Sequence, residues 1–157
     1  MQSTRRLMWI GVVVMALGSH GAVFAQGYGG GSKYNKPAAG LVAAFKTAQT
    51  HATNAARAET LRDSLWHLGH VVNCMEGPRG THYDATNANP CQGQGTGIIP
   101  DLEAMGGQMG ASSALDGVRK ADTLALDTLK LTDLAKVKAG AEKVATMLTQ
   151  ASRAIGQ

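Results

Sequence analysis

The segment HLGHVVNC, residues 67–74, carries two histidines and a cysteine at positions i, i+3 and i+7. On a helix with 3.6 residues per turn, His67, His70 and Cys74 lie on one side. Asp63 lies one turn earlier on that side, which gives the pattern D-x3-H-x2-H-x3-C. Two imidazoles at this spacing can reach one metal ion, and Asp63 can be a third ligand or orient His67.

Imidazole ligands favour Zn²⁺ or copper. Further candidate ligands are His51, in the preceding segment, and His82 or Asp84, in the loop that follows. Three methionines offer thioethers for Cu(I), although methionine more commonly fills gaps in a core: Met75, Met105 and Met109. The structural alternative is that His67 and His70 only pack beneath the loop and hydrogen-bond to it.

An apolar stripe on the same segment points away from the histidines. With Leu61 at zero and about 100° per residue, the stripe stays within about 40° of Leu61. His67 and His70 lie at about 240° and 180°, so we expect them roughly opposite the stripe. The stripe consists of Leu61, Leu65, Leu68, Val72 and Met75.

Cys74 and Cys91 are the two cysteines of the chain. An even cysteine count in an exported domain predicts a disulfide, and two cysteines allow one pairing. The bridge would hold residues 76–97, a long loop rich in Gly, Pro and Asn, against the histidine side. A thiolate metal site is the alternative use of these cysteines. No C-x-x-C-H motif occurs in the sequence, which excludes covalent attachment of a c-type haem.

Residues 1–25 have the composition of a secretory signal peptide. Paired arginines at positions 5 and 6 precede an apolar run over 7–17, and small residues before Gln26 suit cleavage. The apolar run is too short to span a bilayer comfortably. We therefore expect a periplasmic or secreted protein with no transmembrane segment after signal removal.

The charge of the chain is small and dispersed. Fifteen basic and 11 acidic residues give a formal net charge of +4, and removal of the two arginines in the signal peptide leaves +2. This charge provides no basic patch for nucleic acid. Aromatic residues make up 4% of the chain, so stacking platforms for bases or sugars are also scarce.

Residues 26–37 are glycine-rich and polar, which predicts a flexible linker before a domain over 38–157. In that domain, apolar stripes at three- and four-residue spacing predict four helices, and strand signals are nearly absent. A turn near 56–60 separates the first two helices, although one long bent helix is the alternative.

The third predicted helix begins near Pro100 and continues to about Leu129. Gly106, Gly107 and Gly110 weaken its first half, each by about 1 kcal/mol relative to alanine. The last helix keeps a seven-residue apolar period from 134 to 155. We predict an all-α, up-and-down four-helix bundle with one long disulfide-stapled loop.

Two segments of the sequence resemble known groups of proteins. HLGHVVNCMEGPRG followed by NPCQGQGTGI is similar to small exported bacterial helical proteins of undefined function, with the core HLxHxxNCxxG…CxGxG. The similarity covers about a quarter of the chain. THATNAA, residues 50–56, loosely resembles small periplasmic metal-binding helical proteins. Four histidines after Gln26 would limit this chain to one or two defined sites.

These features predict an exported, non-enzymatic protein that binds Zn or Cu through His67 and His70. His51, His82 and Asp63 are the candidate helpers. Two alternatives stay open. One is a metal-free interaction protein of the cell envelope that uses the loop over 76–97 for docking. The other is a bundle that binds haem without a covalent bond, which rests on fold analogy alone.

Overall fold

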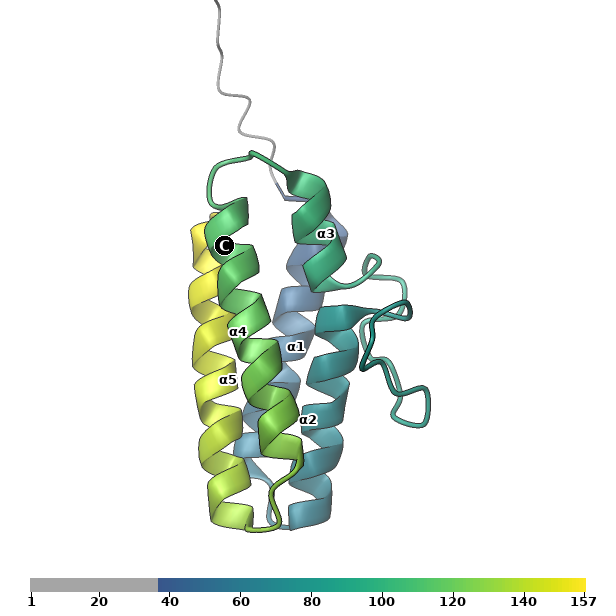
Figure 1. Cartoon of the computed structure of the whole chain (residues 1–157), viewed down its shortest axis with the longest axis vertical. Coiled ribbons are helices and arrows are strands. Elements are labelled where there is room, and N and C mark those ends of the chain that lie inside the picture. The colour runs from purple at the N-terminus through teal and green to yellow at the C-terminus, as the bar shows by residue number, and fades with distance from the viewer. Residues whose placement is uncertain (1–36) are drawn as a thin grey trace, which may run out of the picture. The chain divides into compact units, whose positions relative to one another are not determined.

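Five helices and no strand occur in the part of the chain that the computed structural model describes, residues 37–157 (Figure 1). The all-α prediction is therefore confirmed. The predicted signal peptide, residues 1–25, and all but the last residue of the predicted linker, 26–37, lie outside the described residues. The helices are α1 (Ala39–Arg57), α2 (Leu61–Glu76), α3 (Ile98–Met105), α4 (Ala111–Leu129) and α5 (Leu134–Ala154).

The four long helices pack side by side, and the short α3 follows α2 toward the end of the molecule where α4 begins (Figure 1). Short turns at 58–60 and 130–133 join α1 to α2 and α4 to α5, so each of these pairs is antiparallel. Helix α1 contacts α2 and α5, and α4 contacts α5, α3 and α2. Within the described residues, no helix is both long and apolar enough to cross a membrane.

The prediction of one helix from about 100 to 129 is wrong, and with it the count of four helices. Gly106 ends α3 with φ of +56°, and Gly110 precedes α4 with φ of +80°. Glycine is the residue that adopts this left-handed conformation without steric cost. A Cβ on Gly110 would also clash with the carbonyl of Ala154, so this glycine lets the end of α5 approach the start of α4.

Small side chains make up much of the core. Alanine permits helices to lie close together, but it buries little apolar area per residue. Crosslinks and buried polar contacts therefore contribute a larger share of the stability than they would in a leucine-rich core. The fully buried alanines lie in three helices. They are Ala48, Ala52 and Ala55 in α1, Ala114, Ala121 and Ala125 in α4, and Ala141 in α5.

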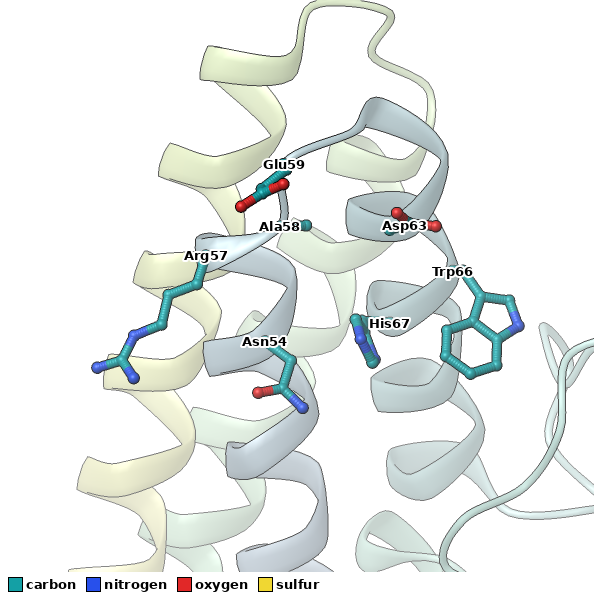
Figure 2. A pocket seen from close by; sticks show the side chains of 7 residues that line it. All are labelled: Asn54, Arg57, Ala58, Glu59, Asp63, Trp66 and His67. Carbon is teal, nitrogen blue, oxygen red and sulfur yellow. The ribbon is translucent and has the colours of Figure 1, made fainter.

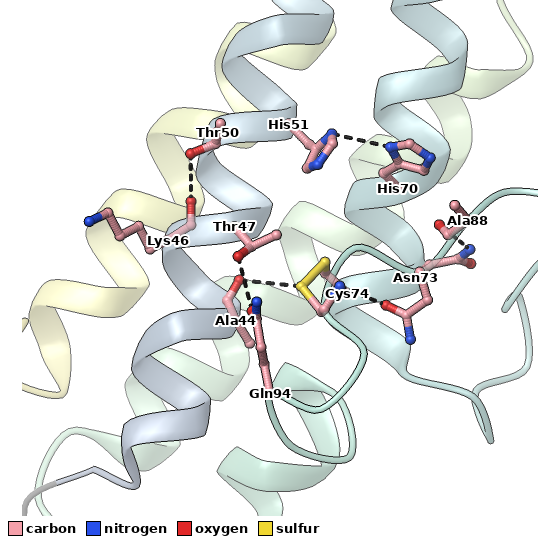
Figure 3. The surroundings of a disulfide bond; sticks show 12 residues. Ala44, Lys46, Thr47, Thr50, His51, His70, Asn73, Cys74, Ala88 and Gln94 are labelled. Atoms are coloured by element: carbon pink, nitrogen blue, oxygen red, sulfur yellow. Dashed lines mark hydrogen bonds between the residues drawn. A yellow bond between two sulfur atoms is a disulfide. The ribbon is translucent and has the colours of Figure 1, made fainter.

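Residues 77–97 leave α2 and return to the start of α3, and two neighbouring residues of α2 hold them in place. Cys74 forms the predicted disulfide with Cys91 (Figure 3). The buried side chain of Asn73 donates to the carbonyl of Asp84 at 2.8 Å and accepts from the backbone N–H of Asp84 at 2.9 Å. The amide thus supplies hydrogen-bond partners that an irregular loop lacks.

Removal of the disulfide by Cys74→Ser/Cys91→Ser is expected to lower the free energy of unfolding by about 3 kcal/mol. The bridge spans a sequence separation of 17 residues, and its loss gives the unfolded chain more conformational freedom. Urea denaturation followed by circular dichroism measures the change. Reduced wild-type protein is the matched control and should lose a similar amount. A variant within about 0.5 kcal/mol of the oxidised wild type would contradict this role.

Candidate metal centre

Three histidines from two helices converge between α1 and α2. The Nδ1 atom of His51 lies 3.0 Å from Nδ1 of His67 and 3.2 Å from Nδ1 of His70. His51 belongs to α1, whereas His67 and His70 belong to α2 and lie one helical turn apart. Figure 3 shows the contact between His51 and His70 across the two helices. The three side chains form a group that could hold a metal ion.

The turn at 58–60 sets the register that brings these histidines together. His51 lies six residues before the end of α1, and His67 lies six residues after the start of α2. Residues at equal distances from a short turn lie level on antiparallel helices, because each helix rises about 1.5 Å per residue. Thr60 caps α2, since its hydroxyl accepts from the backbone N–H of Asp63 at 3.1 Å. The predicted turn near 56–60 is confirmed.

The three Nδ1 atoms cannot all satisfy one another by hydrogen bonding. A ring nitrogen has either one proton or one lone pair in the ring plane. Nδ1 of His51 can therefore make one good hydrogen bond and has two neighbours. A metal ion accepts all three lone pairs. Zn–N bonds of about 2.0–2.1 Å in a tetrahedral site separate the ligand nitrogens by about 3.3 Å, close to the two distances from Nδ1 of His51 to Nδ1 of His67 and of His70.

The surroundings favour the neutral imidazoles that metal ligation requires. Burial, together with the nearby His70 and His67, lowers the pKa of His51 to about 4. Burial and His67 also lower the pKa of His70, whose exposed fraction is 2%. Nε2 of His70 is buried and has no hydrogen-bond partner. A hydrogen bond to the loop, which the structural alternative requires, is thus absent from the described contacts of His70.

Trp66 covers part of the cluster and is itself 48% exposed. Its ring centroid lies 4.1 Å from that of His70 and 4.9 Å from that of His67. The indole also lines an open groove of 470 Å³ beside the cluster (Figure 2). His67 and Asp63 line this groove as well, so solvent and small ligands have access to the His67 side of the cluster.

Asp63 and Asp84, the two aspartates predicted as candidate ligands, do not belong to the three-histidine group. Asp63 shares the groove with His67 and pairs with Arg62 at 3.7 Å, and it is not a member of the histidine group. Asp84 accepts from the backbone N–H and the hydroxyl of Thr86 within the loop. The three-histidine group therefore has no carboxylate ligand among the residues predicted from the sequence.

The methionine thioethers do not gather at the histidines. Met75 is fully buried in the apolar core, Met105 packs against that core, and Met109 is 67% exposed. Met105 is the last residue of α3, and Met109 lies between α3 and α4. Met75 and Met105 agree with the interpretation of methionine as core filler, whereas the exposed Met109 does not.

His82 lies with Glu76 and Asp122 in a second group. Neither Glu76 nor Asp122 is among the candidate ligands that the sequence predicts. One signal was present, because Asp122 follows Val118 by four residues and so falls on the buried side of a predicted helix. Burial and the charge of Glu76 raise the pKa of Asp122 to about 7, against an opposing effect of His82.

No family model, no curated protein and no solved structure matches this chain. The fold and the site therefore define the class of the protein by themselves. It is an all-helical, disulfide-bonded protein with a three-histidine group that could hold a metal ion. The resemblance to small exported helical proteins stays a prediction.

His51→Gln is expected to flatten the pH dependence of stability in the metal-free protein. The pKa of His51 is about 4 in the folded chain and 6.5 ordinarily, so the unfolded chain binds more protons between these values. Stability contributed by neutral His51 is therefore lost as the pH falls from about 6.5 to 4. Urea denaturation at pH 7 and pH 4.5, with a chelator present, measures the loss in both proteins.

The comparison between the two proteins matters because the raised pKa of Asp122 acts with the opposite sign. A buried carboxyl that prefers its proton loses stability as the pH rises toward 7. This contribution is common to wild type and His51→Gln and cancels in their difference. Equal pH slopes for the two proteins would contradict the assignment to His51.

Proposed function

We propose that the protein binds a transition metal ion, Zn²⁺ or copper, through His51, His67 and His70. The convergence of their three Nδ1 atoms carries this proposal. Histidines with a purely structural role are expected to hydrogen-bond to their surroundings. Here the polar contacts of His67 and His70 among the described residues are made with His51.

The donor set determines which ions fit. Three neutral imidazoles suit Zn²⁺ and copper better than the harder Mg²⁺ or Ca²⁺, and copper binds more tightly than zinc to a given nitrogen site. The nitrogens face one another rather than a slot between helices, which favours a single ion over haem. The proposed role is binding or sequestration, and we assign no catalytic step to it.

Export from the cytoplasm is part of the proposal. The disulfide between Cys74 and Cys91 supports an oxidising compartment, because cytosolic thiols are kept reduced. Together with the signal peptide predicted over residues 1–25, it supports a periplasmic or secreted protein.

Calorimetric titration of the oxidised chain with Zn²⁺ and Cu²⁺ tests the proposal. We expect a tight site that takes one ion per chain. His51→Gln, His67→Gln and His70→Gln should each lower its affinity by at least about tenfold, because each removes one ligand. His82→Gln is the matched control, since it removes a histidine outside the cluster and should leave the tight site intact.

Two results would contradict the three-histidine site. One is unchanged affinity in all three variants, and the other is an equal loss of affinity in His82→Gln. Fluorescence provides a second readout, because the Trp66 ring lies tilted against His67 and edge-on to His70, and bound Cu²⁺ should quench its emission. Trp66→Phe should abolish that quenching and retain the binding.

A further inference from the structure

A second set of potential ligands lies where α2 ends. Glu76 is the last residue of α2, His82 lies in the loop that follows, and Asp122 projects from α4. One ligand atom from each residue lies within 4.8 Å of the others. The set thus joins three separate segments of the fold, one of which is the disulfide-stapled loop.

Glu76 is already held in place by the loop. Its Oε2 atom accepts from the backbone N–H of His82 at 2.5 Å, and its Oε1 atom lies 2.6 Å from Nδ1 of the same histidine. The side chain of Glu76 is 8% exposed, whereas that of His82 is 52% exposed. Gly80 lies so close that a Cβ there would clash with the Glu76 side chain. The loop therefore closes over this carboxylate.

Asp122 brings a second carboxyl group to the same place, and one of its two oxygens lacks the partner that burial demands. Its exposed fraction is 8%, and its Oδ1 atom is buried with no hydrogen-bond partner. In the described part of the chain, no lysine or arginine forms an ion pair with Asp122 or Glu76. Two buried carboxylates side by side are costly unless a cation or a proton compensates them.

We propose that Glu76, His82 and Asp122 form a second metal site, for a divalent cation that accepts mixed carboxylate and imidazole ligands, such as Mn²⁺ or Zn²⁺. Carboxylates suit Mn²⁺ and imidazole suits Zn²⁺, so this donor set is harder than three imidazoles. A bound cation would neutralise the two acids and use the unpaired oxygen of Asp122. It would also link the loop to α4. The site is independent of the three-histidine site.

Manganese separates the two sites, because among the divalent first-row transition ions Mn²⁺ binds nitrogen ligands most weakly. The oxidised chain is titrated with Mn²⁺ while electron paramagnetic resonance follows the signal of the free ion. We expect one bound Mn²⁺ per chain. Asp122→Asn and His82→Gln should each lower that affinity at least about tenfold. His67→Gln should leave it unchanged, although the same variant weakens the three-histidine site.

Asp116→Asn is the matched control for charge, because it removes an exposed carboxylate from the same helix and should not change Mn²⁺ affinity. Thermal unfolding in the absence of metal separates ligation from packing. Asp122→Asn should then unfold at the same or a higher temperature than wild type, because it removes a buried charge beside Glu76. Addition of Mn²⁺ should raise the unfolding temperature of wild type and leave that of Asp122→Asn unchanged.

The proposal is overturned if wild type binds no Mn²⁺ and no Zn²⁺ outside the three-histidine site. In that case, the two carboxyl groups share a proton and need no cation. It is also overturned if Asp116→Asn weakens Mn²⁺ binding as much as Asp122→Asn does. If Asp122→Asn fails to fold, His82→Gln decides the question, because its side chain is half-exposed and contributes little to the core. Failure here leaves the three-histidine proposal untouched.

Discussion

The attachment of residues 77–97 to α2 is the constraint on which the rest of the structure depends. The disulfide at Cys74 and the buried amide of Asn73 fix the loop at adjacent positions of the helix. The loop in turn covers α2 one turn earlier, where a Cβ on Gly69 would clash with the side chain of Asn87. This cover helps to bury the second half of α2 on all sides. Both candidate sites lie within two turns of the attachment.

The helices were predictable where local pattern decides them, and the break near Gly110 was not. Apolar stripes identified α1, α2 and α5, and the cysteine count identified the disulfide. The glycines from 106 to 110 weaken a helix there, but the apolar period continues to Leu129 and favours one helix. Their cost inside a helix is only about 1 kcal/mol each. Close approach of α5 to Gly110 decides the break, and that contact joins segments far apart in the sequence.

The candidate sites also divide into residues that local sequence pattern predicts and residues that only the packing of distant segments brings together. His67 and His70 share one helix, so their spacing alone made them a candidate pair. His51 was considered only as a helper, yet it contacts both of them. His51 and His67 lie equally far from the 58–60 turn, so the sequence predicts their contact once that turn is placed. Asp122 could not be paired with Glu76 in that way, because the packing of α4 against α2 brings them together.

Unsatisfied polar atoms connect the two sites. Native proteins leave few buried polar atoms without a partner, and each exception needs an explanation. Among the described residues, the buried side-chain atoms without a partner are Nε2 of His70 and Oδ1 of Asp122. Each belongs to one of the two groups that could hold a metal ion. Unpaired atoms left by imperfect packing would be expected anywhere in the core. The two atoms differ in what an ion would do for them. A cation at the second group would use Oδ1 of Asp122, whereas an ion held by the three Nδ1 atoms would leave Nε2 of His70 without a partner. The unpaired atom therefore supports ligation at the second group only.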